Sequence, residues 1–243
     1  MRLSRIYTPQ PLGNDTSLVL NDETAHYVSK VLRMRPGELI SLFNGTDGER
    51  LALIQLVDKK SVTVLLQETV PCQADPRLPI HLGLGLSRGE RMDFAIQKAT
   101  ETGVSSITPL LTERCEVKLK DERTENRLKH WERVAISACE QSGRCAVPVI
   151  HPPVTLTAWL QEAHAAACYV LDHRTELTLN TTTVAPPSVS FLVGPEGGLS
   201  EDEIAAANAQ GFVSVRIGPR VLRTETAPIV AITLAQHLWG DYR

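Results

Sequence analysis

The chain has 243 residues, and its 42% of hydrophobic and 22% of charged residues are the balance of an ordinary soluble globular protein. A formal net charge of −3 excludes a general basic field, so any contact with nucleic acid must come from a local patch. The start of the chain lacks the apolar core of a signal peptide, and no apolar run is long enough to span a membrane.

Cysteine and histidine spacing argues against a disulfide framework and against a metal site. The five cysteines are odd in number and form no CxxC pair, which we interpret as the reduced thiols of a cytoplasmic protein: Cys72, Cys115, Cys139, Cys145 and Cys168. The seven histidines show no HxxxH or HxE pattern, so we expect no metal. No nucleophile–histidine or paired-carboxylate arrangement is evident, so any chemistry should rely on a bound cofactor and on positioning.

The first part of the chain is expected to form a small sheet or barrel built from consecutive hairpins. Short β-type runs at 39–43, 51–57 and 61–66 are separated by turn sequences, and only 26–32 suggests a helix. Three prolines within 71–79 are typical of a linker. We therefore predict an N-terminal domain at 1–72, a linker at 73–79 and a larger domain at 80–243.

The larger domain alternates strands with helices, which predicts an α/β fold with a mostly parallel sheet. A strand at 80–86 leads to Ser87 and Glu90, which we interpret as a capping box. The helix that follows ends at Gly103, and its apolar face is Met92, Ala95, Ile96 and Ala99. Further helices are expected at 128–138 and 156–163, and further strands near 107 and at 168–171, 189–193 and 213–217.

The most informative segment is LVGPEGGLSEDE at 192–203. A strand ends in Gly-Pro-Glu-Gly-Gly, and Ser200 with Glu203 forms a capping box that starts a helix. Glycine at this place lets a ligand approach the main chain, and ligands of open α/β sheets bind at this edge. The segment matches neither GxGxxG nor the P-loop signature, so it indicates another kind of ligand site or a tight turn without a ligand.

A second segment, at 213–225, repeats this arrangement. A short β-type run ends in Gly218-Pro219, and the loop 220–225 leads into a helix with apolar residues at i, i+3, i+4 and i+7. Pro228 suits the first turn of that helix, where no N–H is needed. The two strand–loop–helix units could form the two walls of one pocket.

Basic residues cluster at several places where they could hold RNA phosphates. Arginine beside tyrosine can bind phosphates and stack a base. The alternative for each cluster is a solvated face with ordinary ion pairs, which is commoner. The candidates are Arg5, Tyr7, Arg33 and Arg35 in the first domain, and Arg88, Arg91, Lys98 and Arg144 in the second.

Taken together, these segments resemble the bacterial RsmE family, the 16S ribosomal RNA (uracil-N3)-methyltransferases of the SPOUT superfamily. The resemblance covers essentially the whole chain and is weakest at 156–187. Its motifs are RIYTP at 5–9, HYVSKVLRMRPGE at 26–38, the segment 87–110, ACEQSGR at 138–144, LVGPEGGLS at 192–200 and IGPRVLRTETA at 217–227.

The resemblance implies an N-terminal PUA-like β-barrel and a SPOUT α/β methyltransferase domain with a trefoil knot. It also implies a homodimer that binds 16S rRNA or the 30S ribosomal subunit, and S-adenosylmethionine held by three loops at 171–173, 193–198 and 217–227. The implied cofactor residues are Leu171, His173, Val193, Gly194, Pro195, Glu196, Gly197, Ile217, Gly218, Leu222, Arg223, Thr224 and Ala227.

The expected reaction is methylation of uridine N3, whose proton must be removed or whose anion must be stabilised. We expect Glu225 to accept the proton and Arg223 to stabilise charge on the carbonyl oxygens; a salt bridge within the loop is the alternative role for this pair. Two rival functions stay open. A SPOUT enzyme of ribose 2′-OH would carry an N-x-G motif, which is not found here, and a ribosome-assembly protein without catalysis is disfavoured by the intact glycine-rich loop.

Overall fold

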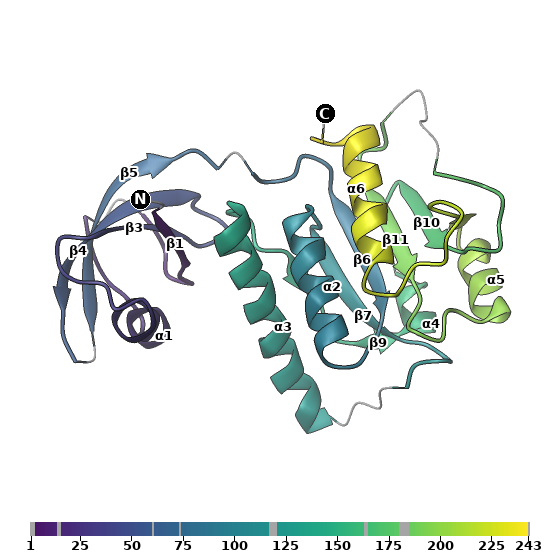
Figure 1. Ribbon diagram of the computed structural model, residues 1–243, viewed down its shortest axis with the longest axis horizontal. Coiled ribbons are helices and arrows are strands. Elements are labelled where there is room, and N and C mark those ends of the chain that lie inside the picture. The colour runs from purple at the N-terminus through teal and green to yellow at the C-terminus, as the bar shows by residue number, and fades with distance from the viewer. Residues whose placement is uncertain are drawn as a thin grey trace. The chain divides into compact units, whose positions relative to one another are not determined.

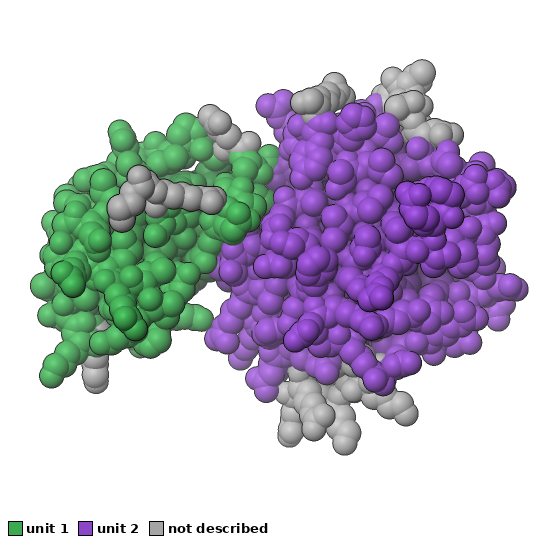
Figure 2. All heavy atoms as spheres, viewed as in Figure 1, with its two compact units in different colours: residues 1–75, 139–147 green, residues 76–138, 148–243 purple. Residues whose placement is uncertain are grey.

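The computed structural model describes residues 3–13, 16–59, 61–72, 74–116, 121–162, 165–179 and 185–242, with the side chains of 121–123 excepted. The chain folds into two compact units, shown in green and purple in Figure 2. Unit 1 consists of Met1–Asp75 and Cys139–Val147, and unit 2 of Pro76–Ala138 and Pro148–Arg243. The first boundary falls within the predicted linker, but the sequence analysis assigned 139–147 to the larger domain.

Unit 1 contains a five-stranded sheet in the order β1-β3-β4-β5-β2. Strand β1 is parallel to β3, and the other pairings are antiparallel, as expected for hairpins. The strands are β1 (Ser4–Tyr7), β2 (Ser17–Val19), β3 (Leu39–Phe43), β4 (Glu49–Val57) and β5 (Val62–Val70).

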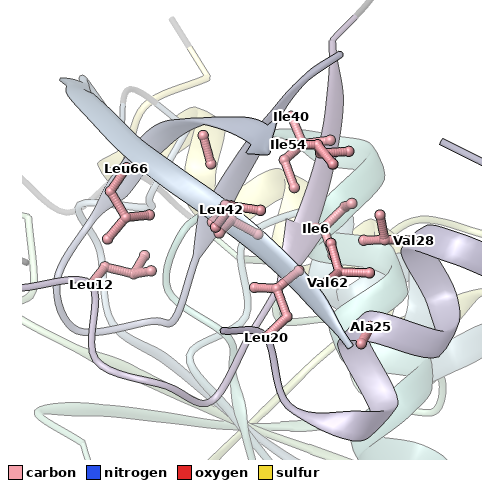
Figure 3. Packing of buried hydrophobic residues seen from close by; sticks show 12 residues of the cluster. Ile6, Leu12, Leu20, Ala25, Val28, Ile40, Leu42, Ile54, Val62 and Leu66 are labelled. Carbon is pink, nitrogen blue, oxygen red and sulfur yellow. The ribbon is translucent and has the colours of Figure 1, made fainter. Parts of the chain in front are cut away.

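A short helical segment covers one side of this sheet. Helix α1 (Asp22–His26) begins where the Asn21 side chain accepts a hydrogen bond from Thr24 N–H, and it continues as the π-helical turn η1 (Tyr27–Val31). Figure 3 shows Ala25 and Val28 lying beside Ile6 and Val62. The helix expected at 26–32 therefore begins earlier, because Asn21 supplies the capping oxygen.

The cysteines depart from the expectation of five free thiols. Cys72 and Cys145 form a disulfide, with Cα atoms 5.9 Å apart, whereas Cys115, Cys139 and Cys168 take part in no disulfide. The bond exists because 139–147 folds onto unit 1, which spacing along the chain could not reveal. Within the described ranges, Glu49, Cys72 and Cys145 could share a metal ion by proximity, but the two sulfur atoms are bonded to each other.

Unit 2 is built on a seven-stranded sheet in the order β12-β10-β11-β6-β7-β8, with β9 also paired to β7. All described pairings in it are parallel, which confirms the predicted α/β fold. Its strands are β6 (Ile80–Gly85), β7 (Ser106–Leu111), β8 (Val149–Ile150), β9 (Val154–Thr155), β10 (Ala167–Leu171), β11 (Val189–Val193) and β12 (Val213–Val215).

Five helices accompany these strands in the described part of the chain: α2 (Glu90–Glu101), α3 (Asp121–Ser142), α4 (Leu156–Trp159), α5 (Glu201–Ala209) and α6 (Ala227–Trp239). Figure 1 shows α2 and α6 side by side in front of β6 and β11. Helix α2 buries its predicted face, and every residue of β11 is buried, as expected for a central parallel strand. Helix α4 is shorter than the helix predicted at 156–163, and Ala163 lies outside the described residues.

Among the described residues, no helix combines the length and the apolar character needed to cross a membrane.

Candidate cofactor and active site

A cavity of about 390 Å³ lies within unit 2, at the carboxyl ends of the neighbouring strands β10, β11 and β12. Its walls come from the loops that follow these three strands, because the carboxyl ends of adjacent parallel strands meet at one edge of a sheet. Every residue that the resemblance implied for the cofactor lines this cavity, as does Glu225. The structure therefore brings together the two walls that the sequence predicted.

The glycine-rich loop is packed too closely for side chains at several positions. A Cβ atom on Gly194 would lie 2.9 Å from the backbone nitrogen of Leu199, and one on Gly197 would lie 2.9 Å from Cβ of Arg114. Gly85 of the neighbouring strand β6 approaches the loop so closely that a Cβ there would overlap Pro195. These contacts fix the loop against β6 and against the segment after β7, and they leave main-chain groups open to the cavity.

The carboxylate of Glu196 is directed at the start of helix α2. Its Oε1 accepts from the backbone N–H of Arg88 at 3.4 Å and from Nη1 of Arg91 at 3.2 Å. The predicted capping box of Ser87 and Glu90 is wrong: the N-cap residue is Gly89, at φ 46°, and it has no side chain to cap the helix. The Glu196 carboxylate, from a distant part of the chain, instead accepts from the N–H of Arg88, the residue just before this N-cap.

The pKa of Glu196 reflects this position. Partial burial raises it, but hydrogen bonds from its own N–H, from Arg88, from Arg91 and from Ser87 together outweigh burial and hold the pKa below its usual value. The carboxylate is therefore ionised, and its negative charge lies at the positive end of the α2 dipole.

The second wall carries the predicted catalytic pair. Nη1 of Arg223 lies 3.9 Å from Oε1 of Glu225, which is a long ion pair. The Arg223 side chain is 79% exposed, whereas that of Glu225 is 15% exposed and Thr224 between them is buried. The N–H groups of Thr226 and Ala227 both donate to the carbonyl of Arg223, which starts helix α6 directly after the loop. The carboxylate is thus held at the cavity wall and the guanidinium reaches outward.

Other lining residues were not assigned from the sequence. They include Arg114 from the segment after β7, Asp172 and Arg174 after β10, and Arg216 and Arg220 after β12. Asp172 accepts from Nε of Arg174 at 2.8 Å. Arg114 could not be found from the sequence, because only the strand order places the end of β7 beside the glycine-rich loop; Arg220 lies inside a recognised motif but has no distinguishing neighbour.

Two of the predicted RNA-binding arginines are largely withdrawn from solvent in unit 1, where Arg144 is buried and Arg5 is partly buried, which corrects that expectation for them. The guanidinium of Arg5 donates to Glu49 at 2.9 Å, to the carbonyl of Cys139 at 2.6 Å and to that of Arg144 at 3.0 Å. Arg144 itself is only 3% exposed. Carbonyls of residues 139–147 thus hold the guanidinium of Arg5, and Arg144 is buried, so neither presents its charge to an RNA backbone.

The remaining candidates differ in how their charge is used. Arg88 pairs with Glu116, Arg91 with Glu196 and Lys98 with Glu101. The ring of Tyr7 packs edge-on against Phe43, with centroids 5.7 Å apart, so it is not free to stack a base. Arg33 and Arg35 are exposed, and among the described residues no carboxylate pairs with either of them.

Comparison with known proteins defines the class of the molecule. A family model described as "RNA methyltransferase domain" matches residues 74–236, and another described as "RNA methyltransferase PUA domain" matches residues 20–67. A parallel α/β unit with a glycine-walled cavity at the strand ends, joined to a PUA unit, is thus an RNA methyltransferase architecture.

Relatives narrow this class. A ribosomal RNA small subunit methyltransferase E of Buchnera aphidicola is 36% identical over 243 residues, which cover all of this chain and 96% of the relative. The structure of the corresponding Neisseria gonorrhoeae protein with S-adenosyl methionine has a TM-score of 0.93 at 35% identity, with both chains fully covered. A methyltransferase of Legionella pneumophila, solved with SAM, has a TM-score of 0.94 at 40% identity and covers 99% of this chain and 100% of its own. The chain belongs to the ribosomal RNA small subunit methyltransferase E family, which confirms the resemblance seen in its motifs.

Proposed function

We propose that this protein uses S-adenosylmethionine to methylate N3 of a specific uridine in the 16S rRNA of the small ribosomal subunit. The observation that carries the proposal is the cavity at the carboxyl ends of β10, β11 and β12, in which all residues implied for the cofactor meet. The names of the relatives support an rRNA substrate of the small subunit, and two similar proteins were solved with the cofactor.

The cavity suits S-adenosylmethionine in size and in character. Its volume of about 390 Å³ lies in the range of small-molecule sites, and its apolar side chains are of the kind that pack against an adenine ring: Leu171, Val193, Ile217 and Leu222. Gly194 and Gly197 open the main chain for polar contacts with the ribose and the methionine part. When bound, the cofactor supplies a methyl group already activated on its sulfonium.

The residues of the second wall then manage the proton of N3. Glu225, held at the cavity wall, accepts this proton as general base. Arg223, whose guanidinium is mostly exposed, stabilises the negative charge that develops on the flanking carbonyl oxygens. The separation of 3.9 Å between the two side chains leaves the carboxylate only weakly neutralised, which suits a base.

RNA recognition is proposed to begin at unit 1. Arg33 and Arg35 are exposed there and follow the η1 turn, so their guanidinium groups are available to phosphates. Because the proposed substrate is the small ribosomal subunit, we also propose that the protein is located in the cytoplasm.

We further propose a homodimer and a trefoil knot in unit 2, as the resemblance implies. Helix α6 is apolar on a second side, where four side chains are only partly buried: Ile229, Val230, Leu234 and Leu238. Phe94 on the neighbouring helix α2 is 44% exposed. Apolar surface of this kind is characteristic of subunit interfaces. Light scattering that gives the mass of one chain at micromolar concentration would contradict the dimer.

Nucleoside analysis of small-subunit rRNA tests the function directly. RNA from a strain without this gene is compared with RNA from the same strain carrying the gene again. Loss and return of N3-methyluridine is the expected result. Loss of a 2′-O-methylated nucleoside would instead identify the ribose enzyme, and an unchanged nucleoside profile would favour an assembly protein without catalysis.

A further inference from the structure

The cofactor cavity is basic, although the chain as a whole is acidic. Its lining contains three carboxylates, from Asp172, Glu196 and Glu225. It also contains six arginines, so positive charges exceed negative charges by three: Arg91, Arg114, Arg174, Arg216, Arg220 and Arg223. The net charge of the whole chain is −3. The positive charge is thus concentrated at this site.

The cofactor does not account for this excess. S-adenosylmethionine carries an ammonium, a sulfonium and a carboxylate, so its own net charge is positive, and a basic lining opposes its entry. An excess of arginine beside a cationic ligand is explained if a second, anionic ligand binds at the same cavity.

Four of the arginines are already paired with carboxylates. The N–O distances are 3.2 Å for Arg91 with Glu196, 2.8 Å for Arg174 with Asp172, 2.8 Å for Arg216 with Glu176 and 3.9 Å for Arg223 with Glu225. Two remain. Among the residues that the structure describes, neither Arg114 nor Arg220 has a carboxylate partner, and both are exposed.

Arg114 is fixed in place without being neutralised. Its Nη1 donates to the carbonyl of Gly197 at 3.2 Å, and its Cβ lies 2.9 Å from the place that a Cβ on that glycine would take. A carbonyl oxygen orients the guanidinium but leaves its charge intact. Arg220 lies in the other wall of the cavity, in the loop between β12 and α6.

We propose that Arg114 and Arg220 form a phosphate-binding rim of the cofactor cavity, which holds a backbone phosphate of the RNA next to the target nucleotide. The planar guanidinium binds phosphate through two parallel hydrogen bonds, which a paired arginine could offer only after losing its partner. Because the cavity also holds the cofactor, the rim fixes the strand where the methyl group is transferred. This inference rests on the proposed function and names the part of the RNA that the same site recognises.

The salt dependence of RNA binding tests the rim. The probe is 16S rRNA transcribed in vitro, and the protein is saturated with S-adenosylhomocysteine so that no turnover occurs. Arg114→Gln and Arg220→Gln should each lower the slope of log Kd against log salt by about 0.7–0.9, the release expected for one lost phosphate contact. Arg114→Lys and Arg220→Lys keep the charge and should keep the slope. Lys129→Gln, an exposed site on α3 outside the cavity lining, is the matched control and should also keep it.

Calorimetry with S-adenosylmethionine separates this inference from the proposed function. Arg220→Gln should bind the cofactor at least as tightly as the unchanged protein, because a like charge has been removed. A wild-type slope in both glutamine variants, or an equal loss in Lys129→Gln, would overturn the rim. Titration of the protein with inorganic phosphate distinguishes free phosphate from the RNA backbone as the ligand. If the free ion binds saturably and the variants leave the salt slope of RNA binding unchanged, the proposed rim is also overturned. Failure of the nucleoside test with a reduced slope in the glutamine variants would instead refute only the reaction.

Discussion

Arg91 and Glu196 join the start of helix α2 to the glycine-rich loop, with 3.2 Å between Nη1 and Oε1. The same oxygen accepts from the backbone N–H of Arg88, just before the glycine N-cap of α2, so one carboxylate holds both a side chain of the helix and the turn that precedes it. Helix α2 in turn packs against α6, which follows the second wall. Glu196 therefore connects the two loops of the cavity through the helices behind them.

Glu196→Gln keeps the shape of this side chain and removes its charge. We expect the free energy of unfolding to fall by about 1 kcal/mol, because a half-exposed ion pair and a charge at a helix N-terminus each contribute less than that. The KM for S-adenosylmethionine should rise while kcat changes little, since the loop is loosened before the chemical step. Arg88→Ala is the control: the N–H of residue 88 remains, and both measurements should stay at wild-type values.

The same contact predicts a pH dependence. The pKa of Glu196 is lower in the folded protein than in the unfolded chain, so its contribution to stability is fully present above the unfolded pKa, about 4.3. It is lost as the pH falls through the lower folded value. The stability difference between wild type and Glu196→Gln should be constant near neutral pH and shrink only in acid below about pH 4. A difference that shrinks near neutral pH would contradict the assignment.

The Cys72–Cys145 disulfide should contribute to the stability of unit 1. It joins residues that are 73 positions apart. A loop of this length limits the unfolded chain enough to stabilise the folded state by about 2–4 kcal/mol. Urea unfolding with and without reductant should show this difference in the wild type and none in Cys72→Ala/Cys145→Ala. Cys139→Ala keeps the bond and should keep the response; two extra thiols titrated in the unreduced, denatured wild type would show that the bond is absent.

A side chain at Gly85 should weaken cofactor binding although this residue lies outside the cavity lining. Gly85→Ala places a methyl group on the Pro195 backbone, so the glycine-rich loop must move. Overpacking of this size costs about 1–3 kcal/mol, and we expect S-adenosylmethionine to bind roughly tenfold to a hundredfold more weakly. Gly13→Ala, where nothing lies within 4 Å of the added atom, is the control for calorimetry. Equal affinities in the two variants would show that the loop position does not matter.

The general-base role of Glu225 predicts a purely kinetic defect. Glu225→Gln should slow methyl transfer by roughly 10²–10⁴-fold with little change in cofactor affinity. Arg223→Ala should also slow transfer, because charge on the uracil carbonyls loses its stabilisation. Single-turnover measurements on 30S subunits separate this step from binding. A near-normal rate for Glu225→Gln would leave the pair as a structural salt bridge.

Arginines of unit 1 should divide into a structural and an RNA-binding group. Arg5→Ala leaves the carboxylate of Glu49 buried without its guanidinium partner, and we expect a loss of about 3–5 kcal/mol in stability. Arg33→Ala/Arg35→Ala should leave stability within about 0.5 kcal/mol and lower the salt slope of RNA binding. An unchanged slope in the double variant would remove this surface from the RNA footprint.

The cavity could be predicted because each of its walls is formed by a short continuous segment with a recognisable sequence pattern. Strand ends, glycines and helix starts occur together at 189–203 and at 213–228, and parallel strands bring such ends to one edge. The capping box of Ser200 and Glu203 needs only neighbouring residues, and the structure confirms it. By contrast, the same pattern at Ser87 and Glu90 failed, since the helix begins two residues later, with Gly89 and not Ser87 as its N-cap.

Charge and cysteine spacing could not show which residues are buried. From the sequence, Arg5 and Arg144 were expected to bind RNA, and Cys72 and Cys145 were expected to be free thiols. All four are placed by the return of 139–147 to unit 1, which depends on contacts between residues far apart in the sequence. Arg114 was not predicted as a lining residue for a related reason: only the strand order brings β7 near β11.

Because unit 1 is made of two separate stretches of chain, it cannot be cut out as a simple N-terminal module. A fragment that stops at the apparent linker would lose the carbonyls of Cys139 and Arg144 that anchor Arg5, and the sulfur to which Cys72 is bonded. A fusion that transfers unit 1 to another protein must include the second stretch as well as the first. The same dependence sets the order of maturation on the ribosome, where unit 1 stays incomplete until residue 147 has emerged.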